Sequence, residues 1–583
     1  MRGLALVFVA LLALTSSSAA ADPDAESAGW TGRFDRPRGA FAPPHTVLLD
    51  GTAERVGLDP APLDEALSRV RAWTEGTPHP LFSGAVTLLA HDGVVVRRDA
   101  AGYALRYEGT RPDGGGQELP RDRWEPARTD TIFDLASISK LFTSIVVMRQ
   151  VEAGRVDVEA PVSRYLPEFA ANGKETVTVR QLLTHTSGLE PFLPLWRDWP
   201  DKPSRIRAVL EAKPQAAPGT RYVYSDLNLI TLGVLAERVS GTDLASLVRE
   251  GITEPLGMRD TGYNPPESVR HRVAATEYTT TPPRGVVRGE VHDENAWSLG
   301  GVAGHAGVFS TAQDLAVLGQ TILNGGVYRG RRVLRQETVR QMLTDYNPGF
   351  PDNAHGLGFE LDQRWYMDGL SGPRTAGHTG FTGTSLVIDP ASRSIAVLLT
   401  NRVHPSREWG SVNPARQAVA GGLARALAVR PVAGDQAWFS GVGNGRTATL
   451  RSPALAPRTG HVSVSFDAFV DTEPTDTLTL ESSVDRGRSW AAVPVRASGP
   501  GAPDGERTAL AGAGHRNWWR VRADLRPDGR ELWLRWRHTT DARYSGRGVY
   551  LDGIRIRDGR GVLLDDEREP GRLTAEGWRP AGR

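Results

Sequence analysis

Ser137 and Lys140 are the residues whose types and spacing first suggest chemistry. They lie three apart at the start of an apolar, helix-compatible run that continues to about Gly154, so on a helix they share one face. A serine hydroxyl is a weak nucleophile until a base takes its proton. A buried lysine can lose its own proton to do this, whereas arginine effectively cannot. Only four of the 69 basic residues are lysine. The pair suggests an activated serine, although this spacing alone suits a surface helix equally well.

Two later stretches carry groups that could assist Ser137. Tyr224-Ser225-Asp226 stands before a helical run. A tyrosine there can act as a base if a cation lowers its pKa, although a buried tyrosine with one hydrogen bond is the plainer interpretation. The stretch from His378 to Phe381 predicts a strand and a turn.

The same elements could build an oxyanion hole. Gly380 would let another chain or a ligand approach the backbone closely. An exposed strand N–H in this stretch could pair with the N–H of Ser137, which we expect in the first turn of a helix.

The three stretches occur in a fixed order: Ser137-Ile-Ser-Lys140, Tyr224-Ser-Asp226 and His378-Thr-Gly380. This chain resembles the serine β-lactamases and penicillin-binding D,D-peptidases, and among these it resembles the class C-like serine hydrolases. The resemblance lies in the order of the three motifs and in the connecting segments 182–189, 218–225 and 300–314. The resemblance covers about residues 57–428. It implies an α+β fold, with an antiparallel sheet flanked by helices and a helical subdomain.

The resemblance also implies roles. Ser137 becomes acylated, while Lys140 and Tyr224 shuttle its proton, with Lys140 lowering the pKa of Tyr224. The N–H groups of Ser137 and Phe381 hold the oxyanion. The residues expected to bind substrate are Asp226, His378, Thr379 and Gly380. No metal or organic cofactor is implied.

Two departures from the family pattern bear on the substrate. Asp226 stands where the family usually has Asn, and an ionised carboxylate only accepts hydrogen bonds, whereas Asn also donates. His378 replaces Lys, and a neutral imidazole recognises a carboxylate less well than an ammonium, unless low pH charges it. Both departures favour an ester or peptide substrate over a β-lactam. Whether Asn228 compensates for Asp226 stays open.

Other polar and aromatic residues can be explained without a direct role in catalysis or metal binding. The contiguous run His292-Asp293-Glu294 cannot converge on one metal ion from a strand or helix. His185 suits a structural cap better than catalysis, and His305, in a Gly-rich loop, suits a supporting role near the site. An aromatic loop could be a lid over the substrate or a packed surface; its members are Phe192, Trp196 and Trp199.

Composition and texture divide the chain into segments. A basic start, an apolar run of about 11 residues and small residues up to Ala21 predict a signal peptide at 1–21, too short to span a bilayer. An irregular lead-in is expected at 22–56, the hydrolase domain at 57–430 and an all-β, jelly-roll-like sandwich at 436–583.

The composition excludes some kinds of chemistry. The chain has no cysteine, which excludes disulfides, a thiol nucleophile and a lipid-modified cysteine. Its net charge of +1 gives no electrostatic reason to expect nucleic acid as a partner.

These observations predict a secreted serine hydrolase with no transmembrane segment, acting on a small molecule or a peptide. D-Ala-D-Ala carboxypeptidase and β-lactamase activity are the alternatives within this chemistry. Seven of the 15 tryptophans lie in the sandwich. Core packing is the plainer use for them, but a contact with cell-wall or plant polysaccharide is an open alternative. A non-catalytic binding protein is the remaining hypothesis, and the joint presence of Ser137, Lys140 and Tyr224 argues against it.

Overall fold

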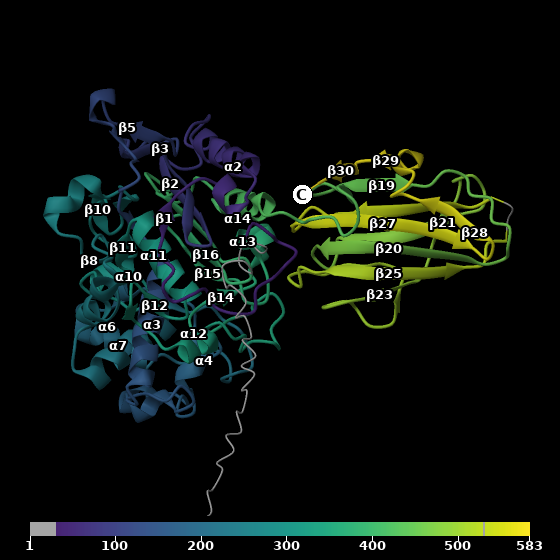
Figure 1. Cartoon of the computed structure of the whole chain (residues 1–583). Coiled ribbons are helices and arrows are strands. Elements are labelled where there is room, and N and C mark those ends of the chain that lie inside the picture. The colour runs from purple at the N-terminus through teal and green to yellow at the C-terminus, as the bar shows by residue number, and fades with distance from the viewer. Residues whose placement is uncertain (1–30, 529–530, 583) are drawn as a thin grey trace, which may run out of the picture.

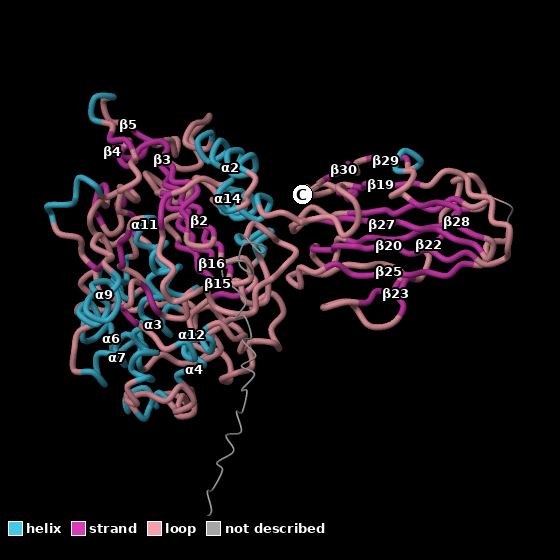
Figure 2. Tube along the Cα trace, viewed as in Figure 1, coloured by secondary structure: helices cyan, strands magenta, loops and turns pink. Residues whose placement is uncertain are grey.

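The structure is a computed structural model that describes residues 31–528 and 531–582. The expected signal segment 1–21 and the lead-in up to residue 30 lie outside the described residues. A larger domain of mixed helices and strands lies beside an elongated all-β domain (Figure 1). Helices are concentrated in the larger domain (Figure 2). No helix of the described residues is long and apolar enough to cross a membrane.

An eight-stranded sheet forms the centre of the larger domain. Its strand order is β1-β3-β2-β17-β16-β15-β14, with β6 paired to β3, and all pairs but β1 with β3 are antiparallel. The strands are β1 (Leu49–Asp50), β2 (Gly84–His91), β3 (Val94–Leu105), β6 (Glu125–Pro126), β14 (Glu360–Leu361), β15 (Ala376–Gly380), β16 (Thr384–Asp389) and β17 (Ser394–Thr400). The hairpin of β2 and β3 turns at Asp92 and Gly93, which both have positive φ, as a tight two-residue turn requires.

Helices cover both faces of this sheet. α2 (Pro60–Ala72) and α14 (Asn413–Ala426) pack against each other and against strands β3 and β17, while α11 (Ala312–Leu323) contacts β2, β16 and β17. The Asp59 carboxylate caps α2 by accepting a hydrogen bond from Ala61 N at 3.0 Å. Cover on both faces explains why β2 and β17 are buried at every residue.

A helical subdomain carries the predicted nucleophile. α3 (Ser139–Glu152) packs against α7 (Asp226–Ser240) and α8 (Leu244–Val248). The sequence predicted one helix starting near Ser137. Instead, Ser137 lies in a separate 3₁₀ turn, η3 (Ala136–Ile138), directly before α3. The preceding Ala136 has a φ of 47°, and its N–H bonds to the Asp134 carboxylate at 2.8 Å, so the chain bends sharply before the helix.

The C-terminal domain is a sandwich of two antiparallel sheets. Their strand orders are β24-β23-β25-β20-β27-β18-β30, with β28 paired to β27, and β22-β21-β26-β19-β29. The shorter strands are β18 (Ala437–Phe439), β19 (Thr447–Arg451), β22 (Ala491–Ala492), β23 (Val495–Ser498), β24 (Glu506–Arg507), β28 (Gly561–Asp565), β29 (Thr574–Glu576) and β30 (Arg579–Ala581). The longer strands are β20 (Val462–Asp471), β21 (Thr477–Ser483), β25 (Trp518–Leu525), β26 (Trp533–Thr539) and β27 (Gly548–Asp558). Trp519, Trp536 and Trp578 are buried in its core, and the other four tryptophans are half-buried. Core packing therefore accounts for these side chains better than a sugar-binding platform.

The two domains share an interface with a buried ion pair. Arg516 of the sandwich meets Asp389 at the end of β16 at 2.6 Å, and neither side chain is exposed. Phe34, which belongs to the expected irregular lead-in, is buried at this junction with Phe469 and Tyr550 of the sandwich. The described part of the lead-in also supplies β1 and the 3₁₀ turn Glu54–Val56. It is thus packed against both domains.

Candidate active site

Ser137 and Lys140 meet at the junction of η3 and α3. Lys140 Nζ donates hydrogen bonds to Ser137 Oγ at 2.8 Å and to the His305 carbonyl at 3.2 Å. The lysine side chain is 1% exposed. The alternative of a lysine on a surface helix is wrong, because α3 is buried along most of its length.

Tyr224 completes the cluster from the segment before α7. Its hydroxyl interacts with the Ser137 and Lys140 side chains, and the Lys140 ammonium lies 4.9 Å from the ring centroid. His185 holds this segment in place. Its Nδ1 accepts a hydrogen bond from Ser225 N at 3.1 Å, and its ring lies 4.5 Å from that of Tyr224. The expected structural role of His185 is thus to position the tyrosine.

Asp226 is an ion-pair partner of the lysine. Its Oδ1 lies 2.8 Å from Lys140 Nζ. Asn228 does not take over the role of the usual family Asn, because it is fully buried and bonds to Ser187 Oγ at 2.7 Å and to His185 Nδ1 at 3.1 Å. Of these two residues, Asp226 contacts Lys140 and Asn228 bonds to other partners.

The ion pair changes the expected proton chemistry of Lys140. Burial favours the neutral amine, but the Asp226 carboxylate and Tyr224 outweigh it and raise the pKa of Lys140 above its ordinary value. Burial raises the pKa of Tyr224 to about 12, and the nearby ammonium counters this only in part. The expectation of a readily deprotonated lysine and a tyrosine of lowered pKa is therefore wrong for the resting site, because the sequence did not show that Asp226 contacts Lys140.

The third motif lies against the chain that leads to Ser137. A Cβ on Gly380 would lie 2.1 Å from Thr384 Oγ1 and 2.2 Å from the Leu135 carbonyl, so only glycine fits. The hydroxyls of Thr382 and Thr384 donate to the Asp134 and Leu135 carbonyls at 2.7 and 3.0 Å. These contacts hold the β15–β16 turn, and with it Phe381, beside Ser137.

His378 departs from its expected place. It is 1% exposed, its Nδ1 lies 2.7 Å from the Thr379 carbonyl, and it is not among the residues that line the adjoining cavity. Burial and the Lys140 charge lower the pKa of His378 to about 3, so the imidazole stays neutral. His378 does not line the cavity, and its contact with substrate stays a prediction, whereas Thr379, Gly380 and Phe381 do line the cavity.

Sequence comparisons agree with this arrangement. The Beta-lactamase family model matches residues 73–421, more than half of the chain. The chain belongs to the beta-lactamase family of serine hydrolases. It is 32% identical over 410 residues to a protein of Salmonella agona (strain SL483) provisionally named D-alanyl-D-alanine carboxypeptidase, covering 64% of this chain and 90% of that protein. An Escherichia coli (strain K12) protein with the same name is 31% identical over 393 residues, 62% of this chain and 87% of that protein.

Solved structures resemble the larger domain. A penicillin-binding protein homologue from Caulobacter crescentus is 24% identical, with a TM-score of 0.48, and covers 63% of this chain and 99% of its own. A class C beta-lactamase is 19% identical, with a TM-score of 0.49, and covers 64% of this chain and 97% of its own. The family model, the central sheet and its covering helices confirm the expected fold of the larger domain. The expected all-β sandwich lies C-terminal to this domain.

Three guanidinium groups and a glutamate at the site were not predicted from the sequence. A cavity of about 610 Å³ opens above Ser137 and Tyr224 and is also lined by Glu360, Arg402, Arg407 and Arg416. Arg416 donates to the Gly380 and Thr384 carbonyls at 2.7 and 3.1 Å. Arginine is the default cation of this chain, so no compositional signal marked these three.

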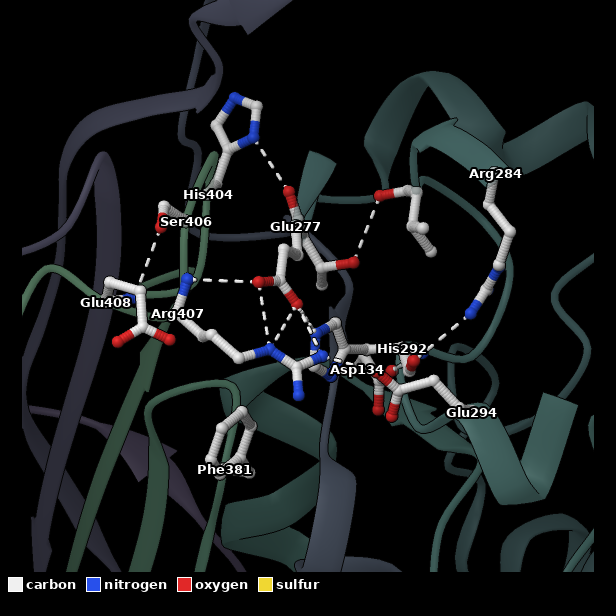
Figure 3. A network of polar contacts seen from close by, with 12 residues as sticks. Asp134, Glu277, Arg284, His292, Glu294, Phe381, His404, Ser406, Arg407 and Glu408 are labelled. Carbon is white, nitrogen blue, oxygen red and sulfur yellow. Dashed lines mark hydrogen bonds and ion pairs between the residues drawn. The ribbon is translucent and has the colours of Figure 1, made fainter. Parts of the chain in front are cut away.

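A polar network supports the Phe381 side of the cavity (Figure 3). Glu277 accepts hydrogen bonds from His292 Nε2 at 2.8 Å and from Arg407 Nε at 2.7 Å, which lower its pKa to about 2 although burial opposes this. The Phe381 ring stacks on His292, with centroids 5.7 Å apart. His292 N also donates to the Asp134 carboxylate at 2.6 Å. The network therefore ties Phe381 to the segment that carries Ser137.

The run His292-Asp293-Glu294 divides between two sites. His292 and Glu294 contact Glu277 and Arg407, respectively, whereas Asp293 Oδ1 lies 2.9 Å from His305 Nε2. The three side chains therefore do not converge.

The three aromatic residues of the loop differ in exposure. Phe192 is 44% exposed and follows Pro191, whose carbonyl accepts from Asp226 N at 2.9 Å. Trp196 and Trp199 are half-buried, and none of the three aromatic residues lines the cavity above Ser137.

Proposed function

We propose that this protein is an exported hydrolase that cleaves an amide or ester through a covalent acyl-Ser137 intermediate. One observation carries the proposal. Ser137 Oγ accepts a hydrogen bond from Lys140 Nζ at 2.8 Å, beside the Tyr224 hydroxyl, at the base of an open cavity. This is the geometry expected of a nucleophile with its base in contact.

Acylation begins in the fraction of molecules in which the Lys140–Tyr224 pair has lost a proton, so that the pair can accept the Ser137 proton. Ser137 Oγ then attacks the substrate carbonyl, and the oxyanion accepts hydrogen bonds from the N–H groups of Ser137 and Phe381. The proton held by the pair passes to the leaving amine or alcohol. A water molecule then loses a proton to the same pair and attacks the acyl carbonyl. The bond to Ser137 Oγ breaks, the pair returns its proton to Ser137 Oγ, and the carboxylic acid product leaves.

The cavity favours a substrate that carries a carboxylate near the cleaved bond. Arg402 donates to the Phe381, Arg407 and Gly410 carbonyls, and Arg416 donates to carbonyls and to the Asn413 amide oxygen. Within the described residues neither forms an ion pair with a carboxylate, whereas Arg407 pairs with two glutamates. Two guanidinium charges are thus available to a substrate anion. They supply the positive charge that a neutral His378 lacks, and they favour a D,D-carboxypeptidase substrate over a simple ester.

Mass spectrometry of the intact protein tests the acyl-enzyme. The wild type, S137A and a remote serine control, S163A, are exposed to a fluorophosphonate, an activated ester or a penicillin. We expect one adduct on the wild type and on S163A, and none on S137A. Absence of any wild-type adduct with all three reagents contradicts the proposal and favours the non-catalytic binding protein.

Relative rates test the substrate class. A nitrophenyl ester, a D-Ala-D-Ala peptide and a chromogenic cephalosporin are compared as kcat/KM on the wild type and on R402Q. We expect the peptide to lose at least tenfold in R402Q while the uncharged ester changes less than threefold. Equal losses on both substrates would show that Arg402 has only a structural role.

Export rests on the predicted signal peptide at 1–21 alone. Expression with and without these residues, followed by fractionation of cells and medium, tests it. A full-length product that stays inside the cell and keeps its N-terminus would contradict export.

A further inference from the structure

A cavity of about 590 Å³ lies where the two domains meet. Its lining comes from α2 and α14, at the side of the larger domain that faces the sandwich (Figure 1), and from β18, β27, β30 and the segments beside them. It shares no lining residue with the cavity above Ser137. Its volume suits a small molecule, and the acyl transfer described above makes no use of it.

Four guanidinium groups line this interdomain cavity. Arg547 precedes β27 and Arg579 begins β30, whereas Arg69 lies on α2 and Arg425 near the end of α14. The positive charges of Arg69 and Arg547 act on Arg425, so these groups lie close together. In the described part of the chain, none of the four forms an ion pair with a carboxylate.

Contacts with the sandwich hold Arg547 in place. It is 4% exposed, and its Nη2 donates to the Leu427 carbonyl at 3.2 Å. Its guanidinium carbon lies 5.4 Å from the Tyr550 ring centroid and 5.8 Å from that of Phe439. Arg579 lies 5.5 Å from the Phe439 ring. The Nε of Arg547 is buried with no hydrogen-bond partner, whereas buried donors are normally paired. The side chain is therefore fixed and has donor capacity to spare.

The two walls of the cavity differ in charge. The sandwich wall carries Arg547 and Arg579 with the polar side chains of Asn444, Ser545 and Tyr550, and it has no carboxylate. The wall from the larger domain adds three carboxylates to its arginines: Asp59, Glu65 and Asp368.

These opposite charges do not close into ion pairs across the cavity. Elsewhere at the same interface, Arg516 and Asp389 meet at 2.6 Å. Within the described residues, none of the three carboxylates of the cavity has such a partner. A ligand that satisfies both walls therefore carries an anionic group at one end and hydrogen-bond donors at the other.

We propose that this interdomain cavity binds a small polyol phosphate, with the phosphate on the arginines of the sandwich wall and the hydroxyl groups on the carboxylates of the larger domain. A phosphate monoester carries close to two negative charges at neutral pH, and guanidinium forks bind its oxygens in pairs. Hydroxyl groups donate to ionised carboxylates, which only accept. The proposal does not depend on the acyl transfer at Ser137.

Isothermal titration calorimetry of the full chain at low salt tests the proposal. The probes are glucose 6-phosphate, inorganic phosphate and glucose. We expect glucose 6-phosphate to bind at least about tenfold more tightly than either of the other two, because it alone uses both walls.

The arginine wall is tested with R579M. Arg579 is exposed at the start of β30, so the variant should fold, and it should bind glucose 6-phosphate at least about tenfold more weakly than the wild type because a charge-assisted hydrogen bond is lost. The matched control is R507M, because Arg507 is exposed on β24 and lies outside the lining, and we expect no change. Thermal midpoints check the fold of each variant. If R579M does not fold, R425M takes its place.

The carboxylate wall is tested with E65A. Glu65 is exposed on α2, and alanine preserves the helix. The advantage of glucose 6-phosphate over inorganic phosphate should fall to about threefold or less, because the hydroxyl groups lose an acceptor.

Each outcome decides the proposal. Absence of glucose 6-phosphate binding overturns the site, and so does an R579M variant that binds as tightly as R507M. Equal affinities for glucose 6-phosphate and inorganic phosphate, or for glucose 6-phosphate and glucose, overturn a polyol phosphate as the ligand. An unchanged advantage in E65A overturns the role of the carboxylates. S137A should bind glucose 6-phosphate like the wild type, so a failed acyl-enzyme test leaves this inference standing.

Discussion

Replacing Asp226 by Asn tests the electrostatic account of the site most directly. Asp226 Oδ1 lies 2.8 Å from Lys140 Nζ, and the lysine side chain is 1% exposed while the aspartate is 21% exposed. Coulomb's law at an effective dielectric constant of 20 gives about 6 kcal/mol for such a pair. Allowing about half of this for the partial exposure of Asp226 and for the amide dipole that replaces it leaves about 3 kcal/mol, which corresponds to about two pKa units on Lys140.

The expected result is a shift of the acid limb of kcat/KM. The limb should move about two pH units towards acid in D226N, because a lower pKa of Lys140 leaves more of the enzyme able to take the Ser137 proton at a given pH. The assay is hydrolysis of a nitrophenyl ester from pH 5 to 10, below the raised pKa of Lys140, where a shift of two units appears as a rate up to about 100-fold higher in D226N at the same pH. D243N is the control, because Asp243 caps α8 and Asn can cap it as well.

Stability gives the same perturbation a second readout. The pKa of Lys140 is raised in the folded state, so the ion pair contributes stability that is full below the unfolded pKa of about 10.4 and is lost as pH rises through the higher folded pKa. D226N should therefore be less stable than the wild type at pH 7 by about 3 kcal/mol, with a smaller difference above pH 11. An acid limb that stays in place in a folded D226N would refute the coupling between Asp226 and Lys140, whatever its absolute rate.

Three further predictions concern the turn, the cavity and the interface. G380A should lower activity at least about 100-fold, because its Cβ would displace the β15–β16 turn from Leu135. The control G39A should keep wild-type activity, because a Cβ there meets nothing within 4 Å. Equal activities of G380A and G39A would contradict the close packing of Gly380 against Leu135. Burial raises the pKa of Glu360 to about 7, so the folded state binds the extra proton and loses stability as pH rises from about 4.3 to 7. E360Q should gain up to about 3 kcal/mol on the wild type across that window, and parallel thermal midpoints at pH 5 and pH 8 would disprove it. R516M leaves Asp389 buried without its cation and should lower the free energy of urea unfolding by about 3–5 kcal/mol. The control R496M, at an exposed ion pair, should leave this free energy almost unchanged. Similar losses in both variants would argue against a stabilising interface.

Local sequence determined the elements and the identity of the reactive groups. The helix from Pro60, the hairpin turning at Asp92 and the strands around Gly380 follow from capping, turn and alternation patterns that act over a few residues. The three ordered motifs indicated the family, and they named Ser137, Lys140 and Tyr224, which the structure brings together. The alternating texture of the C-terminal segment likewise predicted the sandwich.

Tertiary structure alone decided the charges around those groups. Asp226 and His305 both lie far from Lys140 along the chain, His305 by 165 positions, and no local pattern shows that both meet the same ammonium. The same reason explains why His378 proved buried and neutral while Arg402 and Arg416 line the cavity. The sequence lists side chains, but electrostatic energy depends on distance and burial, so the protonation of this site was settled by which segments the fold places side by side.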